Sequence, residues 1–189
     1  MNPTPEPLAL LSDVGAVLEG HFQYASGRHG PLYVEKFRLL EDPQATTNLC
    51  GQIARHFADA DVELVVGPTT GGIILAFETA RQMGVPNYFA ERRAEGGREF
   101  ARGFSFKPGQ RTLVVDDVLT TGGSVLDTIA AVREAGGEPI GVGLVVDRSG
   151  GRSDLGLPTF ACMTLDIETF SAEDCPQCQD PNGPPLTVT

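Results

Sequence analysis

The sequence predicts an α/β fold in which helices flank a mostly parallel, twisted sheet. Short apolar runs at 63–66, 112–115 and 140–146 have the composition of buried strands, and segments with helical spacing of apolar residues alternate with them. Polar turns rich in glycine, hydroxyl or acidic residues follow these runs, at 67–72, 116–124 and 147–151. Ligands bind beyond the carboxyl ends of parallel strands, so we expect the three turns to meet at one cleft.

Each helix is predicted where apolar residues recur every three or four positions. The predicted helices cover 8–18, 43–60, the stretch from the turn at 67–72 to about 83, and 125–135, which Gly136 and Gly137 stop. Strands are predicted at 63–66, 85–90, 112–115, 140–146 and 159–165, with short strands around a loop in 21–36. The polar stretch 91–103 has no apolar period and is expected to be a mobile loop or loose hairpin. The tail from Cys175, rich in proline and glycine, is expected to be irregular.

Composition restricts the class of protein. A chain of 189 residues suits one domain with a sizeable core. Its formal charge of -11 disfavours a nucleic-acid partner, and no apolar run approaches the roughly 20 residues that span a membrane. Residues 1–7 lack the basic and then apolar order of a secretory signal, so a cytoplasmic location is expected. Lys36 and Lys107 are the only lysines in the sequence, so an anion site would depend on arginine.

Four cysteines are present. Cys50 and Cys162 have apolar neighbours and are expected to be buried thiols. Cys175 and Cys178 have the spacing of a redox pair or of two metal ligands, and three interpretations stay open: a local turn, a disulfide or a metal site. A structural zinc site normally needs two more ligands, and the sequence has no second cysteine pair of this kind. A metal site at this cysteine pair would therefore need an ion that two subunits share.

The turn at 116–124 carries the strongest chemical signal. It follows an apolar strand and precedes a helix, and it combines an acid pair with hydroxyl residues and glycines. Backbone N–H groups of 121–124 and the start of the helix can hold a phosphate, while Asp116 and Asp117 suit two vicinal ribose hydroxyls. The sequence contains neither a P-loop nor a dinucleotide-binding glycine motif. A sugar phosphate is therefore the predicted ligand.

Four segments carry a resemblance to a known family. Residues 114–125, VVDDVLTTGGSV, resemble the phosphoribosyl pyrophosphate motif of the type I phosphoribosyltransferases. Residues 20–33 resemble the N-terminal substrate segment of the orotate phosphoribosyltransferases, and 67–74, GPTTGGII, resemble the pyrophosphate loop of that family. Asp147 and Arg148 resemble the strand end whose arginine meets the orotate carboxylate. The resemblance covers roughly residues 11–178.

The resemblance implies a type I phosphoribosyltransferase fold. One domain would cover 1–189, with a core at about 43–165 and a small hood formed by about 8–40 and the C-terminal segment. The implied reaction transfers the ribose 5-phosphate of 5-phospho-alpha-D-ribose 1-diphosphate to orotate, giving orotidine 5'-monophosphate and diphosphate in de novo pyrimidine (UMP) biosynthesis. The implied cofactor is Mg2+, bound through the substrate and through water to Asp116 and Asp117, without a direct protein ligand. A homodimer is also implied.

The resemblance also implies roles for individual residues. Those implied in binding phosphoribosyl pyrophosphate are Asp116, Asp117, Val118, Leu119, Thr120, Thr121, Gly122, Gly123 and Ser124, together with Thr69, Thr70, Gly71, Arg92 and Arg93. Those implied in binding orotate are Ser26, Gly27, Tyr33, Thr120 and Arg148. The acid pair at 116–117 is also assigned to catalysis.

The sequence departs from that family in its catalytic loop. The stretch 91–103 contains neither lysine nor histidine, and Gly71 occupies a position where lysine is common. Arg98 and Arg102 are the remaining cations able to stabilise pyrophosphate, and Arg98 is the one assigned to catalysis. Ala25 replaces a further lysine, and Gly30 replaces a serine. Two alternatives stay open: a purine phosphoribosyltransferase with the same central turn, and a non-catalytic regulator that senses phosphoribosyl pyrophosphate.

Overall fold

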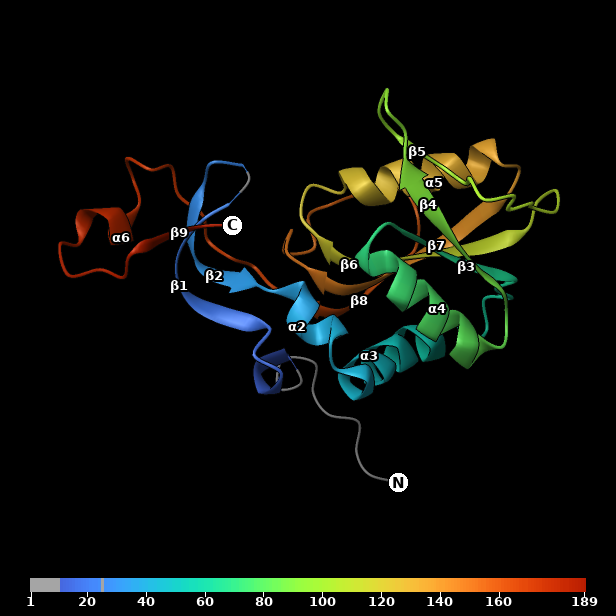
Figure 1. The fold of residues 1–189 in the computed structure, drawn as a ribbon, viewed down its shortest axis with the longest axis horizontal. Helices are drawn as coiled ribbons and strands as arrows, with labels where there is room; N and C mark the ends of the chain where they lie inside the picture. Colours follow the sequence, from blue (N-terminus) through green and yellow to red (C-terminus); the bar gives the residue numbers. More distant parts are fainter. Residues whose placement is uncertain (1–10, 25) are drawn as a thin grey trace.

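A six-stranded, mostly parallel sheet forms the core of the larger part of the molecule (Figure 1). The computed structural model describes residues 11–24 and 26–189. The strands of this sheet are β3 (Leu64–Pro68), β4 (Asn87–Arg92), β5 (Arg98–Glu99), β6 (Arg111–Leu119), β7 (Glu138–Asp147) and β8 (Thr159–Thr164). They lie in the order β5-β4-β3-β6-β7-β8, and neighbours are parallel except for the antiparallel β4–β5 hairpin. The predicted α/β class with a mostly parallel sheet is confirmed.

Helices cover both faces of this sheet (Figure 1). Helices α3 (Pro43–His56) and α4 (Gly71–Met83) pack on one face, and α5 (Gly123–Glu134) packs on the other. Alternate side chains of β3 point to opposite faces: Val65 joins the apolar cluster under α3 and α4, whereas Leu64 and Val66 join the cluster under α5. A strand that is buried on both faces is continuously apolar, and this property made the central strands predictable.

Local signals fix where the helices begin and end. Helix α3 begins at Pro43, after Asp42, whose carboxylate accepts hydrogen bonds from the backbone N–H groups of Gln44 (2.9 Å) and Ala45 (3.0 Å). Helix α4 ends at Gly84, which adopts the left-handed conformation that stops a helix. Helix α5 has no side-chain cap at its start, so its first N–H groups are available to the preceding turn or to a ligand.

A second, three-stranded sheet lies beside the core (Figure 1). It consists of β2 (His29–Val34), β1 (Val17–Gln23) and β9 (Leu186–Val188), in that order, and is called the hood sheet below. Strands β1 and β2 form an antiparallel hairpin, while β9 pairs with β1 in parallel. The short helix α2 (Lys36–Leu40) leads from the hood sheet to α3, and α6 (Pro176–Gln179) lies in the C-terminal segment beside the hairpin.

Two predictions for these terminal segments are wrong. The helix predicted at 8–18 is limited in its described part to 11–13, because Gly15 takes a positive φ of 68°, and β1 then begins at Val17. Residues 8–10 lie outside the described residues. The tail from Cys175 is also not irregular, since it forms α6 and β9. Proline at the first position of α6 is compatible with a helix start, where no N–H donor is lost.

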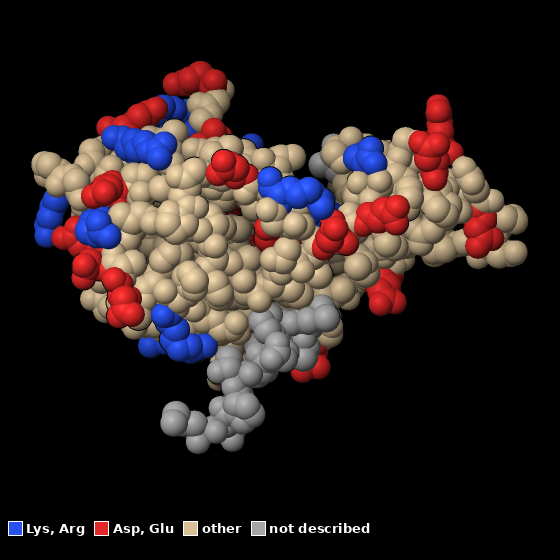
Figure 2. Space-filling view, turned by 180° about the vertical axis from the view of Figure 1, so that it is seen from behind, with Lys and Arg blue, Asp and Glu red and all other residues tan. Residues whose placement is uncertain are grey.

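The surface carries charges of both signs. In Figure 2, Lys and Arg side chains lie scattered among Asp and Glu side chains over the face shown. The polar stretch 91–103 contains the turn of the β4–β5 hairpin, so the hairpin that the sequence predicts is present, and its mobility stays a prediction. Within 11–24 and 26–189, no helix has the length and apolar character needed to cross a membrane.

Candidate active site

Asp116 and Asp117 lie near the carboxyl end of β6, in the middle of the sheet. Each residue is 5% exposed. Asp116 Oδ1 accepts a hydrogen bond from the backbone N–H of Asp117 (2.9 Å), and Asp117 Oδ1 accepts one from the N–H of Val118 (2.7 Å). Buried carboxylates are costly unless they are paired or hydrogen-bonded, so an acid pair in this position is typical of a functional site.

Lys36 pairs with this acid pair, although no sequence motif singled it out. Its Nζ atom lies 3.0 Å from Asp117 Oδ2, and its side chain is 38% exposed. Lys36 begins α2, and the packing of α2 against α4 brings it to the end of β6. No spacing rule connects these two positions in the sequence. The only available signal was that lysine is rare in this chain.

The acid pair has an unusual protonation equilibrium. Burial and the neighbouring Asp117 carboxylate raise the pKa of Asp116 to about 7. The positive charge of Lys36 lowers the pKa, but this effect is smaller. Without a ligand, the folded protein therefore holds a proton on Asp116 between about pH 4 and pH 7, where the unfolded chain does not. A cation that binds together with a ligand would favour the ionised form of Asp116.

The turn after β6 has the features of an anion site. Gly122 has a positive φ of 84°, and α5 begins at Gly123 without a side-chain cap. Asp116 and residues 118–125 line a hollow of about 50 Å³. Thr120 and Thr121 are exposed and carry hydroxyl donors. Free N–H groups at a helix start and the positive end of the helix dipole favour an anion in such a hollow.

The turn after β3 lies directly against the acid pair. A Cβ atom on Gly67 would be 2.1 Å from the carbonyl oxygen of Gly72, so the turn is closed tightly on itself. A Cβ atom on Gly71 would be 2.2 Å from Asp117 Oδ2. A lysine at position 71 would displace this carboxylate, which explains the glycine there. Thr70 is exposed, and the peptide bond that joins it to Thr69 is cis.

Arg98 reaches from β5 to both of these turns. It is 4% exposed, and its guanidinium donates hydrogen bonds to Ser124 Oγ (3.0 Å), Thr69 Oγ1 (3.3 Å) and the carbonyl of Ala90 (3.1 Å). Burial, reinforced by Arg92, lowers the pKa of Arg98 from the ordinary arginine value, but a guanidinium stays charged at neutral pH. The hairpin therefore delivers a buried cation to the site.

The other arginines of the hairpin are placed differently. Arg93 pairs with Glu134 of α5 at 2.7 Å, and Arg102 pairs with Glu91 at 2.8 Å. Arg92 is exposed. In this structure Arg93 and Arg102 thus neutralise acidic neighbours on the hairpin and on α5.

The third turn places Arg148 beside the central turn. Leu119 lies opposite Asp147 in the β6–β7 register, and the N–H of Arg148 donates to the carbonyl of Leu119 (2.9 Å). The Asp147 carboxylate accepts hydrogen bonds from the N–H groups of Ser149 (2.7 Å) and Gly151 (3.1 Å), which curl the turn. The buried Nε atom of Arg148 has no hydrogen-bond partner among the described residues, so it can donate to an anionic ligand.

Tyr24, which directly follows β1 of the hood sheet, contacts Arg148. The guanidinium carbon of Arg148 lies 4.6 Å from the centre of the Tyr24 ring, close enough for a cation–π interaction. Sequence reasoning named the segment but not this residue. Of the residues that it did name there, Ser26 and Gly27 are exposed, and Tyr33 packs against another aromatic ring of the hairpin.

These contacts and the fold define the class of protein. All three turns at the carboxyl edge of the sheet are joined by direct contacts, as the sequence predicts. Residues 39–173 match the phosphoribosyl transferase domain family, which is more than half of the chain.

Relatives that match nearly the whole chain show which family of phosphoribosyltransferases it belongs to. The orotate phosphoribosyltransferase of Desulforamulus reducens is 43% identical over 173 residues, which are 92% of this chain and 90% of that protein. The orotate phosphoribosyltransferase of Pelotomaculum thermopropionicum is 45% identical over 174 residues, 92% of this chain and 91% of that protein. This chain belongs to the orotate phosphoribosyltransferase family.

A solved structure supports the same fold. The crystal structure of orotate phosphoribosyltransferase from Aeropyrum pernix is similar with a TM-score of 0.69 and 29% sequence identity. The similarity covers 83% of this chain and 92% of that chain. The type I phosphoribosyltransferase fold predicted from the central turn is confirmed.

Asp116→Asn should stabilise the ligand-free protein at pH 8. A carboxylic acid whose pKa is higher in the folded than in the unfolded state opposes folding when ionised, and stability is gained as the pH falls through about 7. The amide removes this penalty at high pH. We expect calorimetry to show a melting temperature about 2–4 °C above wild type at pH 8, equivalent to about 1 kcal/mol at this size. The difference should shrink toward pH 5.

The control is Asp59→Asn, a change at an exposed aspartate. Its melting temperature should stay within about 1 °C of wild type at both pH values, since surface substitutions have small effects. A lower melting temperature of the Asp116 variant at both pH values would contradict a carboxylate whose ionisation opposes folding.

Proposed function

We propose that this protein transfers the ribose 5-phosphate of 5-phospho-alpha-D-ribose 1-diphosphate to orotate, giving orotidine 5'-monophosphate and diphosphate in pyrimidine biosynthesis. The observation that carries the proposal is the junction of the three turns. It combines a buried acid pair, an uncapped helix start and an arginine with a spare donor. The names of the relatives support the proposal.

The donor substrate would bind at the central turn. Asp116 and Asp117 would accept hydrogen bonds from the two ribose hydroxyls, and Lys36 would hold the Asp117 carboxylate in position. The N–H groups and hydroxyls of 118–124 would surround the 5-phosphate at the start of α5. Val118 and Leu119 would contribute through their backbone, and Thr120 would face both substrates.

The leaving pyrophosphate would lie at the turn after β3. Residues 69–71 would donate hydrogen bonds to it, and Arg98 would provide the positive charge, since it already connects Thr69 with Ser124. Arg92 would approach from the hairpin, and Arg93 would do so after leaving its pair with Glu134. As pyrophosphate leaves, the ribose C1 becomes cation-like, so a fixed charge at the leaving group lowers the barrier.

The donor atoms of the site fit Mg2+. Hard oxygen ligands such as carboxylates and hydroxyls are those that Mg2+ prefers, and the acid pair lacks enough nearby positive charge to keep the pKa of Asp116 low. When bound with the substrate, Mg2+ supplies charge neutralisation at the pyrophosphate. Asp116 and Asp117 would hold its water molecules without direct coordination.

The acceptor base would bind beside Arg148. A guanidinium forms a two-pronged pair with a carboxylate, and the Tyr24 ring fixes one face of it. Ser26 and Gly27 of the loop between β1 and β2, Tyr33 of β2 and Thr120 would cover the orotate ring. A purine base has no carboxylate for Arg148, and this difference favours orotate over the purine alternative.

A homodimer in the cytoplasm is the proposed form of the enzyme. Phe37 of α2 and Ile74 and Phe77 of α4 are large apolar side chains with exposures of 54%, 44% and 58%. Helices α2 and α4 contact each other, so these side chains are available as the centre of an interface. No two of the four cysteines form a disulfide within the described residues, which supports a reducing compartment.

A direct activity assay tests the proposal. Purified protein mixed with orotate, phosphoribosyl pyrophosphate and Mg2+ should consume orotate, which is followed by its ultraviolet absorbance, and should release one pyrophosphate per turnover. Turnover with adenine, guanine or hypoxanthine but not with orotate would replace the proposal with the purine alternative. Binding of phosphoribosyl pyrophosphate without turnover of any base would favour the regulator.

Arg148→Ala should weaken orotate binding selectively. The lost hydrogen bonds to a carboxylate are worth about 1.5–3 kcal/mol, so the KM for orotate should rise about 10–100-fold, with a small change in the KM for phosphoribosyl pyrophosphate. Arg148→Lys keeps the charge but loses the two-donor geometry of the guanidinium. Its KM for orotate should therefore lie between those of wild type and Arg148→Ala. Steady-state kinetics with each substrate varied in turn measures both constants, and equal increases would refute a role at the base.

Arg98→Ala should lower kcat about 100-fold, because removal of one preorganised donor costs about 3 kcal/mol of transition-state stabilisation. Arg133→Ala removes an exposed arginine in the last turn of α5 and serves as the control with unchanged kcat. Circular dichroism would verify that each variant is folded. A larger loss in Arg102→Ala than in Arg98→Ala would transfer the proposed role to Arg102.

A further inference from the structure

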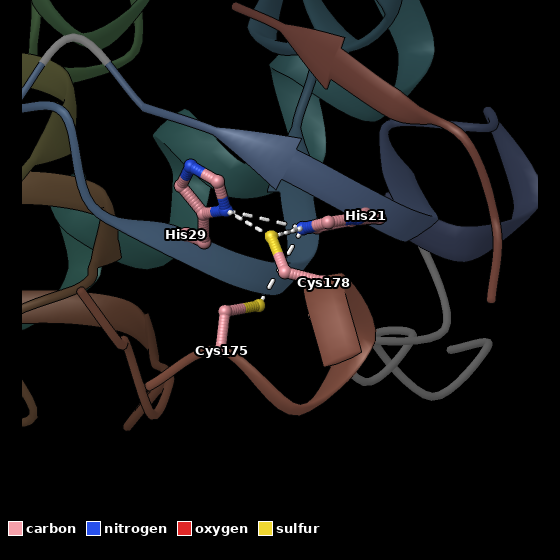
Figure 3. Close-up of side chains that lie close together, drawn as sticks. All are labelled: His21, His29, Cys175 and Cys178. Carbon is pink, nitrogen blue, oxygen red and sulfur yellow. Dashed lines mark hydrogen bonds between the residues drawn. The ribbon is translucent and has the colours of Figure 1, made fainter. Parts of the chain in front are cut away.

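Four side chains with metal-binding atoms meet beside the hood sheet (Figure 3). His21 lies on β1, His29 lies on β2, and Cys175 and Cys178 lie at the start of α6 and within it. Their donor atoms all lie within 4.8 Å of one another. His21, His29 and Cys175 are buried, and neither sulfur is in a disulfide. Figure 3 shows the four side chains pointing toward a common centre.

The distances between these atoms agree with a tetrahedral ion. Bonds of about 2.05 Å to nitrogen and about 2.3 Å to sulfur place two nitrogens about 3.3 Å apart, and a nitrogen and a sulfur about 3.5 Å apart. His21 Nε2 and His29 Nδ1 are 3.1 Å apart. Cys178 Sγ is 3.2 Å from His29 Nδ1, and both sulfurs are 3.5 Å from His21 Nε2. These four of the six donor–donor distances each lie within about 0.4 Å of the tetrahedral value, and all six are within 4.8 Å.

Hydrogen bonds alone satisfy this cluster poorly. His21 Nε2 faces three possible partners, His29 Nδ1 and the two sulfurs. A ring nitrogen carries either one N–H or one lone pair, so it can make one good hydrogen bond in this plane, not three. A metal ion at the centre would accept a lone pair from all four atoms at once. The convergence of the four side chains is therefore explained better by coordination.

We propose that His21, His29, Cys175 and Cys178 bind one Zn2+ ion. A tetrahedral set of two nitrogens and two sulfurs is typical of zinc and unlike the oxygen ligands that Mg2+ and Ca2+ prefer. The protein supplies all four ligands, so no position is open to substrate or water and the site is structural. The ligands that the cysteine pair lacked in the sequence are two histidines of the same chain, and no second subunit is needed.

The ion would fasten the C-terminal segment to the hood sheet. Helix α6 has four residues and none of them is buried, so apolar packing contributes little to its position. The β9–β1 pairing holds the end of this segment, and Arg28 donates hydrogen bonds to Thr169 before α6. Nearer the cluster, Phe170 and His29 exchange two backbone hydrogen bonds of 2.9 Å, and the Gln177 side chain of α6 donates to the carbonyl of Gly20 (2.9 Å). Small segments without an apolar core commonly depend on a metal for their fold, which is the role that the cluster would serve here.

Metal analysis of the full-length, untagged protein tests this proposal without reference to transferase activity. Protein expressed with added zinc and purified without chelator should contain about one zinc per chain by plasma mass spectrometry. Cys178→Ser removes the most accessible ligand and should reduce the content below about a tenth of an ion. Cys162→Ser changes a thiol outside the cluster and should retain the zinc.

Two measurements on wild type keep the test decisive if the Cys178 variant misfolds. Cobalt added to chelator-treated protein should give the visible absorption of a tetrahedral cobalt–thiolate centre. Removal of zinc should lower the melting temperature by at least about 5 °C and speed proteolytic cleavage after residue 165. Zinc-supplemented wild type with less than about a tenth of an ion per chain and no cobalt spectrum would overturn the proposal. A Cys175–Cys178 disulfide in the intact mass of freshly purified protein would also overturn it.

Discussion

The burial of two carboxylates at the end of a central strand is the main energetic constraint on the site, because the surrounding groups must offset its cost. Asp116 and Asp117 are held by backbone N–H groups, by Lys36 from α2, and by the close approach of Gly71. These contacts do not fully offset burial, since the pKa of Asp116 stays raised. A ligand that brings cations would complete the compensation. Binding and ionisation of the site are therefore linked, and ligand-free stability is lower for that reason.

The parts of the fold that depend on local sequence were predictable. Strands β3, β6 and β7 are buried on both faces, so each appears as a continuous apolar run with a polar turn at its carboxyl end. Because parallel strands all end at one edge, the meeting of the three turns followed from the fold class alone. The central turn also carries its acids, hydroxyls and glycines next to one another in the chain. Its ligand could therefore be predicted from the sequence without knowledge of the geometry.

The parts that depend on packing between distant segments were not predictable. The Lys36–Asp117 pair, the Tyr24–Arg148 contact and the histidine–cysteine cluster each join residues that no spacing rule connects. The helix predicted at 8–18 failed for a related reason, because a single left-handed glycine divides an apolar pattern that fits a helix. In the hairpin 91–103, the burial of Arg98 could be recognised only once the sheet had placed β5 next to β4.

The parallel pairing of β9 with β1 sets an order for folding. Leu186 lies opposite His21, although the whole core sheet separates them along the chain. During synthesis β1 and β2 leave the ribosome before the core, and a two-stranded hairpin alone is only marginally stable in water. It has to wait for β9 until the intervening core has been made. The core then holds both ends of the long connection near each other, which reduces the chain entropy lost on closure. The hairpin that is synthesised before the core is thus completed after it.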